Sequence, residues 1–186
     1  MQLEKYHEDG YCLLKSLVDV DRVREDVLKV FDPFTSSTDQ GLFDLFENDF
    51  DTYLACTKAC HQLPSLHSLG LSDAVLGQAQ EVISFPLINT RPVLLFSSQK
   101  LAKHHFYWKA HSHQDGAIML GGSDSLVAWI PLCDMNEELG YLEVVPGSHK
   151  HGLLKHVRNG PSLEIEEDIP DSSFISEEMS KGDVLF

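Results

Sequence analysis

The sequence predicts an α+β fold that is mainly β, in which helices come first and short strands follow. Apolar residues recur at helical spacing through the first half, and from about residue 92 short β-rich runs alternate with turns. The chain has 186 residues, 42% of them apolar, which suffices for one domain with a hydrophobic core. We expect a single domain over residues 1–186, mostly helical over 1–90 and a barrel or sandwich of strands over 91–186.

Three helices are expected in the first half. Asp19 or Asp21 can cap the first, which the Asp32-Pro33 pair should end. Asn48 or Asp49 can open a second helix that stops at Pro64, and Ser72 can cap a short third one over DAVLGQAQE. The apolar stripe of the first helix consists of Val20, Val23, Val27, Val30 and Phe31.

The second half contains the runs PVLLFSS, GAIML, SLVAWIPL and YLEVV, separated by glycine or charged turns. Short runs of this kind are typical of strands in all-β architectures. The last six residues, KGDVLF, contain a turn followed by the start of an apolar strand. Because that strand is cut after three residues, Val184 to Phe186, we expect the natural domain to continue further.

Composition excludes several classes of function. The formal charge is −15, and an acidic surface repels phosphate backbones, so nucleic acid is not an expected partner. No apolar run approaches the roughly 20 residues of a membrane helix, and MQLEKYHEDG does not resemble a secretory leader. The four cysteines form no CxxC pair, and Cys56 and Cys60 are interpreted as buried thiols on one helix face. We expect a cytoplasmic protein.

The stretch HSHQDG, residues 111–116, contains the strongest candidate metal ligands. On an extended strand His111, His113 and Asp115 would share one face. Two histidines and a carboxylate on one face of an ion form the site of non-haem Fe(II) oxygenases. Ten histidines and 16 aspartates in 186 residues nevertheless predict about one His-x-Asp by chance, so the flanking sequence must decide.

The flanking sequence resembles the phytanoyl-CoA dioxygenase family of Fe(II)/2-oxoglutarate oxygenases. After His113-Gln114-Asp115 come DSLVAWIPL, from residue 124, and ELGYLEVVPGSHK, ending at Lys150. The opening Glu8-Asp9-Gly10-Tyr11 and the late Lys181-Gly182-Asp183-Val184 also resemble that family. The resemblance runs from about residue 6 to 186, and residues 111–150 are its most specific part.

The resemblance implies a double-stranded β-helix, a jelly-roll or cupin-like core, over residues 91–186. It implies Fe(II) held by His113 and Asp115, with 2-oxoglutarate and O2 as cosubstrates and ascorbate as a further candidate. The expected reaction hydroxylates a small organic substrate while 2-oxoglutarate is decarboxylated to succinate. The presence of Asp115, where halogenating relatives have a small residue, favours hydroxylation.

Other side chains receive roles from the same resemblance. Gln99 and Lys103 match positions that approach the cosubstrate, with a polar pair at a strand end as the alternative. Trp129 matches a tryptophan that can line the cosubstrate pocket, with a core aromatic as the alternative. The family pattern does not use His111 as a ligand, and His149 is expected to stabilise its turn by a hydrogen bond.

The family also uses a later histidine ligand and an arginine that pairs with 2-oxoglutarate, both expected just after Phe186. Residues 1–186 alone are therefore expected to be inactive or nearly so. Two alternatives remain: a cupin-like metal or small-molecule binding protein without oxygenase activity, and a scaffold that kept the fold but lost the site. Succinate release separates the enzyme from the first, and iron binding that depends on His113 separates it from the second.

Overall fold

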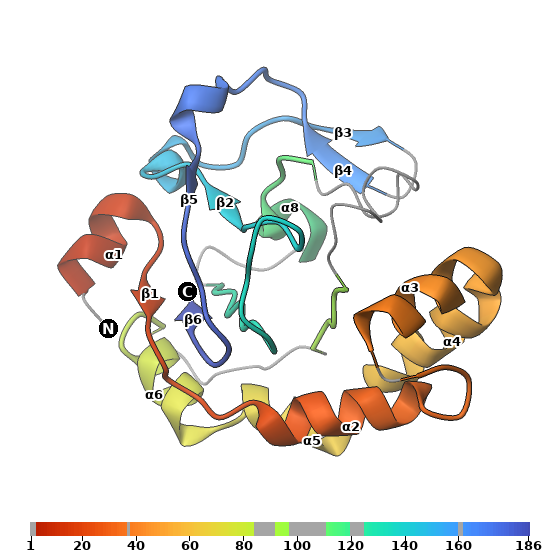
Figure 1. The fold of residues 1–186 in the computed structure, drawn as a ribbon. Coiled ribbons are helices and arrows are strands. Elements are labelled where there is room, and N and C mark those ends of the chain that lie inside the picture. Colours follow the sequence, from red (N-terminus) through yellow and green to blue (C-terminus); the bar gives the residue numbers. More distant parts are fainter. Residues whose placement is uncertain (1–2, 37, 84–91, 97–110, 120–124, 160–161) are drawn as a thin grey trace.

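The computed structural model describes residues 3–36, 38–83, 92–96, 111–119, 125–159 and 162–186. Helices occupy most of the first half and short strands the second (Figure 1). The α-helices are α1 (Leu3–Asp9), α2 (Asp21–Phe31), α3 (Asp39–Asn48), α4 (Phe50–Cys60), α5 (Pro64–Gly70), α6 (Asp73–Gln80) and α8 (Asp115–Met119). The strands are β1 (Leu13–Leu14), β2 (Glu143–Val144), β3 (His156–Asn159), β4 (Ser162–Ile165), β5 (Ile175–Ser176) and β6 (Val184–Leu185). Two 3-10 turns, η2 (Ser148–His151) and η3 (Asp171–Ser173), complete the described elements.

The largest hydrophobic core lies among α2, α3, α4 and α5. In α2 the buried residues recur every three or four positions, so one stripe of the helix faces α4 and α5. This confirms the helix that the stripe from Val20 to Phe31 predicts. Phe31 and Tyr53 are the largest fully buried side chains of the cluster, and their rings lie 6.0 Å apart.

The starts of the helices explain which of them could be predicted. Asp49 caps α4, since its Oδ1 accepts a hydrogen bond from the Thr52 amide at 3.1 Å. We expected Pro64 to end the second helix, but α4 already ends at Cys60. Pro64 instead lies in the first turn of α5, where a missing N–H costs nothing. The sequence pattern did not predict α3. Its first turn is capped by the Thr38 hydroxyl, which accepts a hydrogen bond from Gly41 N–H at 3.1 Å.

The described strands form three antiparallel pairs, β1 with β6, β2 with β5 and β3 with β4. The prediction of an α+β fold is confirmed, but the prediction that it is mainly β is wrong for the described residues, which contain more helix than strand. These three pairs do not by themselves make up a jelly roll. The first four residues of the run GAIML lie in α8 and not in a strand. Short apolar runs do not distinguish helix from strand by periodicity, so this expectation was wrong.

The last strand lies between two other segments. Leu185 pairs with Leu13 on one side and forms an antiparallel bridge with Trp129 on the other. Asp183 holds the preceding turn, because its carboxylate accepts hydrogen bonds from the Ser16 and Ser180 amides, each at 2.8 Å. The predicted turn and strand start in KGDVLF are thereby confirmed.

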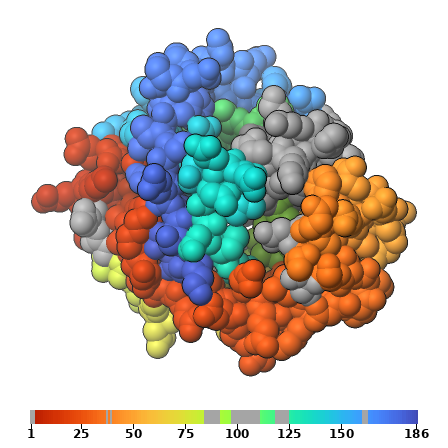
Figure 2. All heavy atoms as spheres, viewed as in Figure 1, coloured from red at the N-terminus to blue at the C-terminus, as the bar shows by residue number. Residues whose placement is uncertain are grey.

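The segment around residue 130 continues alongside the C-terminal segment, and the two are neighbours on the face shown in Figure 2. Met135 N–H donates to Met179 O at 3.0 Å, and Gly182 N–H donates to Pro131 O at 3.1 Å. Among the helices of the described ranges, we find none with the length and apolar character that crossing a membrane requires.

Candidate functional site

The candidate ligands lie where an irregular segment enters α8. His113 precedes the helix, and Asp115 is its first residue, so the stretch is not the extended strand considered from the sequence. The irregular segment that enters α8 nevertheless places the two side chains close together, with His113 Nε2 and Asp115 Oδ1 3.5 Å apart. Both side chains are partly exposed, at 36% for His113 and 42% for Asp115. Neither side chain is fully buried, so each can contact a ligand.

The other ring nitrogen of His113 is occupied by a backbone contact. Its Nδ1 lies 2.7 Å from His111 O, and a carbonyl can only accept, so Nδ1 carries the proton. The neutral ring then presents the lone pair of Nε2 toward Asp115. Metal-binding histidines commonly have this arrangement, in which a hydrogen bond at one nitrogen fixes the tautomer and orients the other.

The pKa of His113 is raised above its ordinary value. The main cause is the hydrogen bond that the protonated ring makes with Asp115. Partial burial lowers the pKa, and the hydrogen bond with His111 O raises it further. A cation beside the Asp115 carboxylate is therefore favourable at this position. A metal ion would take the place of that proton.

His111 is directed elsewhere. Its Nε2 lies 3.5 Å from Glu164 Oε1 on β4. The structure thus groups His113 with Asp115 and pairs His111 with a different carboxylate.

The stretch is fastened to the β3–β4 hairpin and to the segment before it. Ile165 N–H donates to Ser112 O at 2.9 Å, and the Gln114 amide N–H donates to His156 Nε2 at 3.1 Å. The Gln114 side chain donates to Gly152 O at 2.9 Å and accepts from Leu154 N–H at 2.8 Å. Sequence reasoning missed Gln114 and His156, whose only signal was the position of Gln114 between the two candidate ligands.

Of the three candidate cosubstrate residues, the structure describes one. Gln99 and Lys103 lie outside the described residues. Trp129 is partly buried against the cluster of Tyr11, Met179 and Leu185, and its backbone N–H donates to Leu185 O at 2.9 Å. Trp129 thus packs as an aromatic of the core, and its role at the cosubstrate stays a prediction.

His149 forms a hydrogen bond, but to a distant segment. Its Nε2 lies 3.1 Å from His7 O, and Gly147 N–H donates to Asp9 O at 2.7 Å. These two bonds attach the turn over residues 146–149 to α1 and to the stretch of residues 8–11. Two parts of the chain that resemble the same family are direct neighbours.

His113 and Asp115 fit a shared metal ion. Two adjacent ligands with bonds of roughly 2.1 Å stand about 3 Å apart, close to the observed 3.5 Å between the two donor atoms. Imidazole and carboxylate are ligands that Fe(II) accepts. In the part of the chain that the structure describes, no third His, Cys, Asp or Glu joins them to form a three-residue group.

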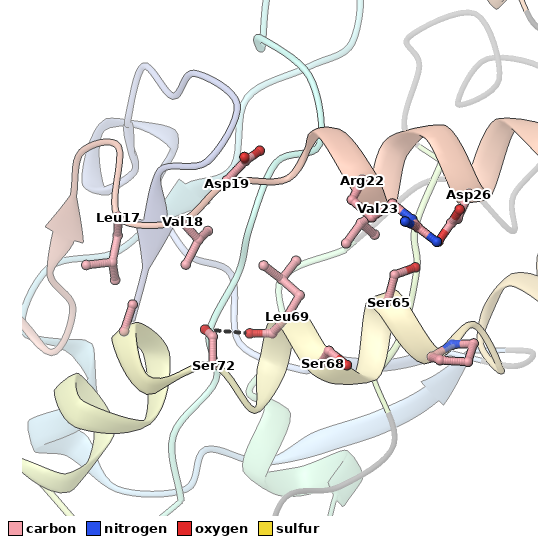
Figure 3. Close-up of a pocket in the computed structure, with 12 residues that line it drawn as sticks. Leu17, Val18, Asp19, Arg22, Val23, Asp26, Ser65, Ser68, Leu69 and Ser72 are labelled. Atoms are coloured by element: carbon pink, nitrogen blue, oxygen red, sulfur yellow. Dashed lines mark hydrogen bonds and ion pairs between the residues drawn. The ribbon is translucent and has the colours of Figure 1, made fainter.

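A separate cavity lies between α2 and the α5–α6 region, with a volume of about 650 Å³ (Figure 3). Apolar side chains such as Val23 and Leu69 form much of its wall, and Arg22 and Asp26 lie 3.0 Å apart at its rim. None of the described residues that line it is a candidate site residue, so among the described residues it is separate from the His113–Asp115 pair.

Comparison with known proteins agrees with the resemblance seen in the motifs. The sequence model of the phytanoyl-CoA dioxygenase family matches residues 6–186. A phytanoyl-CoA dioxygenase from Arabidopsis thaliana is 24% identical over 221 residues, covering 99% of this chain and 78% of the relative. The 1-deoxypentalenic acid 11-beta-hydroxylase of Streptomyces exfoliatus is 25% identical over 203 residues, covering 97% of this chain and 68% of the relative. The family match spans nearly the whole chain, and the chain belongs to the phytanoyl-CoA dioxygenase family.

Proposed function

We propose that this protein is an Fe(II)- and 2-oxoglutarate-dependent dioxygenase that hydroxylates a small organic substrate. Its relatives are named as a dioxygenase and a hydroxylase, which supports an oxygenase. The observation that carries the proposal is the His113 Nε2 and Asp115 Oδ1 pair, 3.5 Å apart and accessible. The proposal includes a double-stranded β-helix around this site.

In this proposal His113 binds the iron through Nε2, and Asp115 binds it through its carboxylate. The hydrogen bond from Nδ1 to His111 O keeps the imidazole in the tautomer that can bind, at 2.7 Å. When bound, the iron supplies the oxidative chemistry, together with 2-oxoglutarate and O2, that hydroxylates a C–H bond and yields succinate. The chain contributes the ligands, their orientation and the surface that positions the substrate.

Metal binding is a more direct readout of the proposal than turnover, because it reports on His113 and Asp115 themselves.

The proposal is tested by anaerobic titration with Fe(II), followed by addition of 2-oxoglutarate. Formation of the metal chelate is measured by its visible charge-transfer absorption, and succinate is measured after O2 is admitted. His113→Ala and Asp115→Ala should each abolish the absorption, whereas His111→Ala should retain it. Equal absorption in wild type and His113→Ala would remove the basis of the proposal. Iron binding that requires His113 but that 2-oxoglutarate leaves spectroscopically unchanged would favour a metal-binding protein without oxygenase activity.

A further inference from the structure

Gln114 separates the two candidate ligands, and both described hydrogen bonds of its side chain are made with one short segment. Its side-chain amide donates to Gly152 O at 2.9 Å and accepts from Leu154 N–H at 2.8 Å. This is the pattern that a neighbouring strand would offer to the same two backbone groups. The side chain therefore links the start of α8 to residues 152–154.

His156 completes the same attachment from the other side. Its Nδ1 lies 2.8 Å from Leu154 O, so Nδ1 donates, and Nε2 is left as the acceptor for the Gln114 backbone N–H at 3.1 Å. Both ring nitrogens of His156 are thus engaged, and the ring is not a candidate ligand in this arrangement. Its position is fixed further by β3, where His156 is paired with Ile165 of β4.

The neighbouring backbone contact reaches the same end of the hairpin. Ile165 N–H donates to Ser112 O at 2.9 Å, so the two members of the pair His156–Ile165 hold residues on either side of His113. In Figure 1 α8 lies beside β3 and β4, as these bonds require. Rotation of residue 114 would move His113 and Asp115 relative to each other.

We propose that Gln114 and His156 are positioning residues that hold His113 and Asp115 in the geometry for binding one metal ion. The inference depends on the proposed function, because it assumes that these two side chains share an ion. It adds a prediction about residues that do not touch the ion. Loss of supporting hydrogen bonds around metal ligands typically lowers affinity about 10- to 100-fold.

The test uses Mn²⁺ as the probe, with the free ion measured by electron paramagnetic resonance in the presence of the full 186-residue chain. Gln114→Met and His156→Ala should weaken Mn²⁺ binding about 10- to 100-fold. His156→Gln places an amide oxygen near the former Nε2 and should recover part of the affinity. His151→Ala is the matched control, because His151 is an exposed histidine on η2 in the same region, and it should bind as wild type does.

Thermal unfolding and amide hydrogen exchange are measured on the same variants. The positioning role predicts faster exchange of the Gln114 and Leu154 amides and weaker Mn²⁺ binding below the unfolding transition. Equal Mn²⁺ affinity in Gln114→Met, His156→Ala and wild type would overturn the inference while leaving the proposed function in place. Affinity lost in His156→Ala and not regained at all by His156→Gln would also overturn it, provided that both variants are folded.

Failure of the proposed function has a different result. It would appear as unchanged Mn²⁺ binding in His113→Ala. In that case hydrogen exchange alone would test whether the Gln114 side chain holds residues 152–154. Unchanged exchange of the Leu154 amide in Gln114→Met would contradict this contact.

Discussion

The imidazole of His149 lies directly against the Cα of Gly10. A Cβ added at Gly10 would stand 2.2 Å from His149 Nδ1, and the φ angle of Gly10 is +82°, which L side chains rarely adopt. The same ring accounts for the contact at 3.1 Å between Nε2 and His7 O. A glycine at position 10 is thus required both by the backbone angle and by the neighbouring ring.

Replacing Gly10 with alanine should destabilise the protein by about 2–4 kcal/mol, because it combines a left-handed backbone with an overpacked contact. Urea unfolding followed by circular dichroism measures this. Gly77→Ala is the control, since Gly77 lies in α6 with nothing within 4 Å of the added Cβ. That change should be neutral or stabilising by up to ~1 kcal/mol. His149→Ala should relieve part of the Gly10→Ala penalty, and strict additivity of the two changes would contradict the packing described.

Gly182→Ala should be at least as destabilising, and no side-chain truncation should relieve it. The added Cβ would stand 2.2 Å from the backbone oxygen of Val18, and φ is +81°. This oxygen belongs to the segment whose own N–H donates to Gly182 O at 3.1 Å, so it cannot move away without loss of that bond. We expect a loss of about 2–4 kcal/mol in the same urea assay. A variant as stable as wild type would show that this turn is not held as closely as described.

Asp183→Asn should lower the free energy of unfolding by about 2 kcal/mol near neutral pH. The carboxylate is 1% exposed and accepts from two backbone amides, so an amide NH2 in its place would face a donor. Burial opposes ionisation, but the bonds from Ser180, Ser16 and Lys15 outweigh it, and the pKa of Asp183 is lowered.

A group whose folded-state pKa is lowered stabilises the protein above its unfolded pKa, and that contribution is lost as pH falls through the folded pKa. The stability difference between wild type and Asp183→Asn should therefore be constant from about pH 5 to 7 and shrink below about pH 3.9. Urea unfolding across this range measures it. A difference that grew on acidification would show that Asp183 is not the ionised acceptor described.

The sequence predicted α2, α4 and α6, and it missed α1, α3 and α5. The stripe of α2 and the cap of α4 carry signals that do not depend on distant residues. By contrast, α3 contains a glycine, Gly41, in its first turn, which discourages a helix interpretation. The structure explains why position 41 is a glycine. A Cβ there would stand 2.2 Å from Ser36 O, because residues 35–36 pack against the start of the helix.

The motif predicted the candidate ligands, but local geometry decided how they meet. The sequence pattern placed His113 and Asp115 on one face of a strand. In the structure the two residues lie instead where the chain enters α8. The supporting contacts from residues 152–156 span about 40 positions along the chain, at separations of 38 to 42 residues. No spacing rule within the motif reports contacts at that separation, so Gln114 and His156 required the folded structure.

The four cysteines should differ sharply in their reactivity toward a thiol reagent. Cys133 is exposed, whereas Cys12, Cys56 and Cys60 are buried. Burial raises the pKa of Cys60 to about 12, and the thiolate is the reactive form, so Cys60 is protected twice. Brief treatment of the native protein with iodoacetamide at pH 8, followed by peptide mass spectrometry, should modify Cys133 alone. Treatment in denaturant should modify all four and serves as the control. Rapid native labelling of Cys60 would mean that α4 separates from the α2 and α5 core, and would contradict the packing on which the helical half depends.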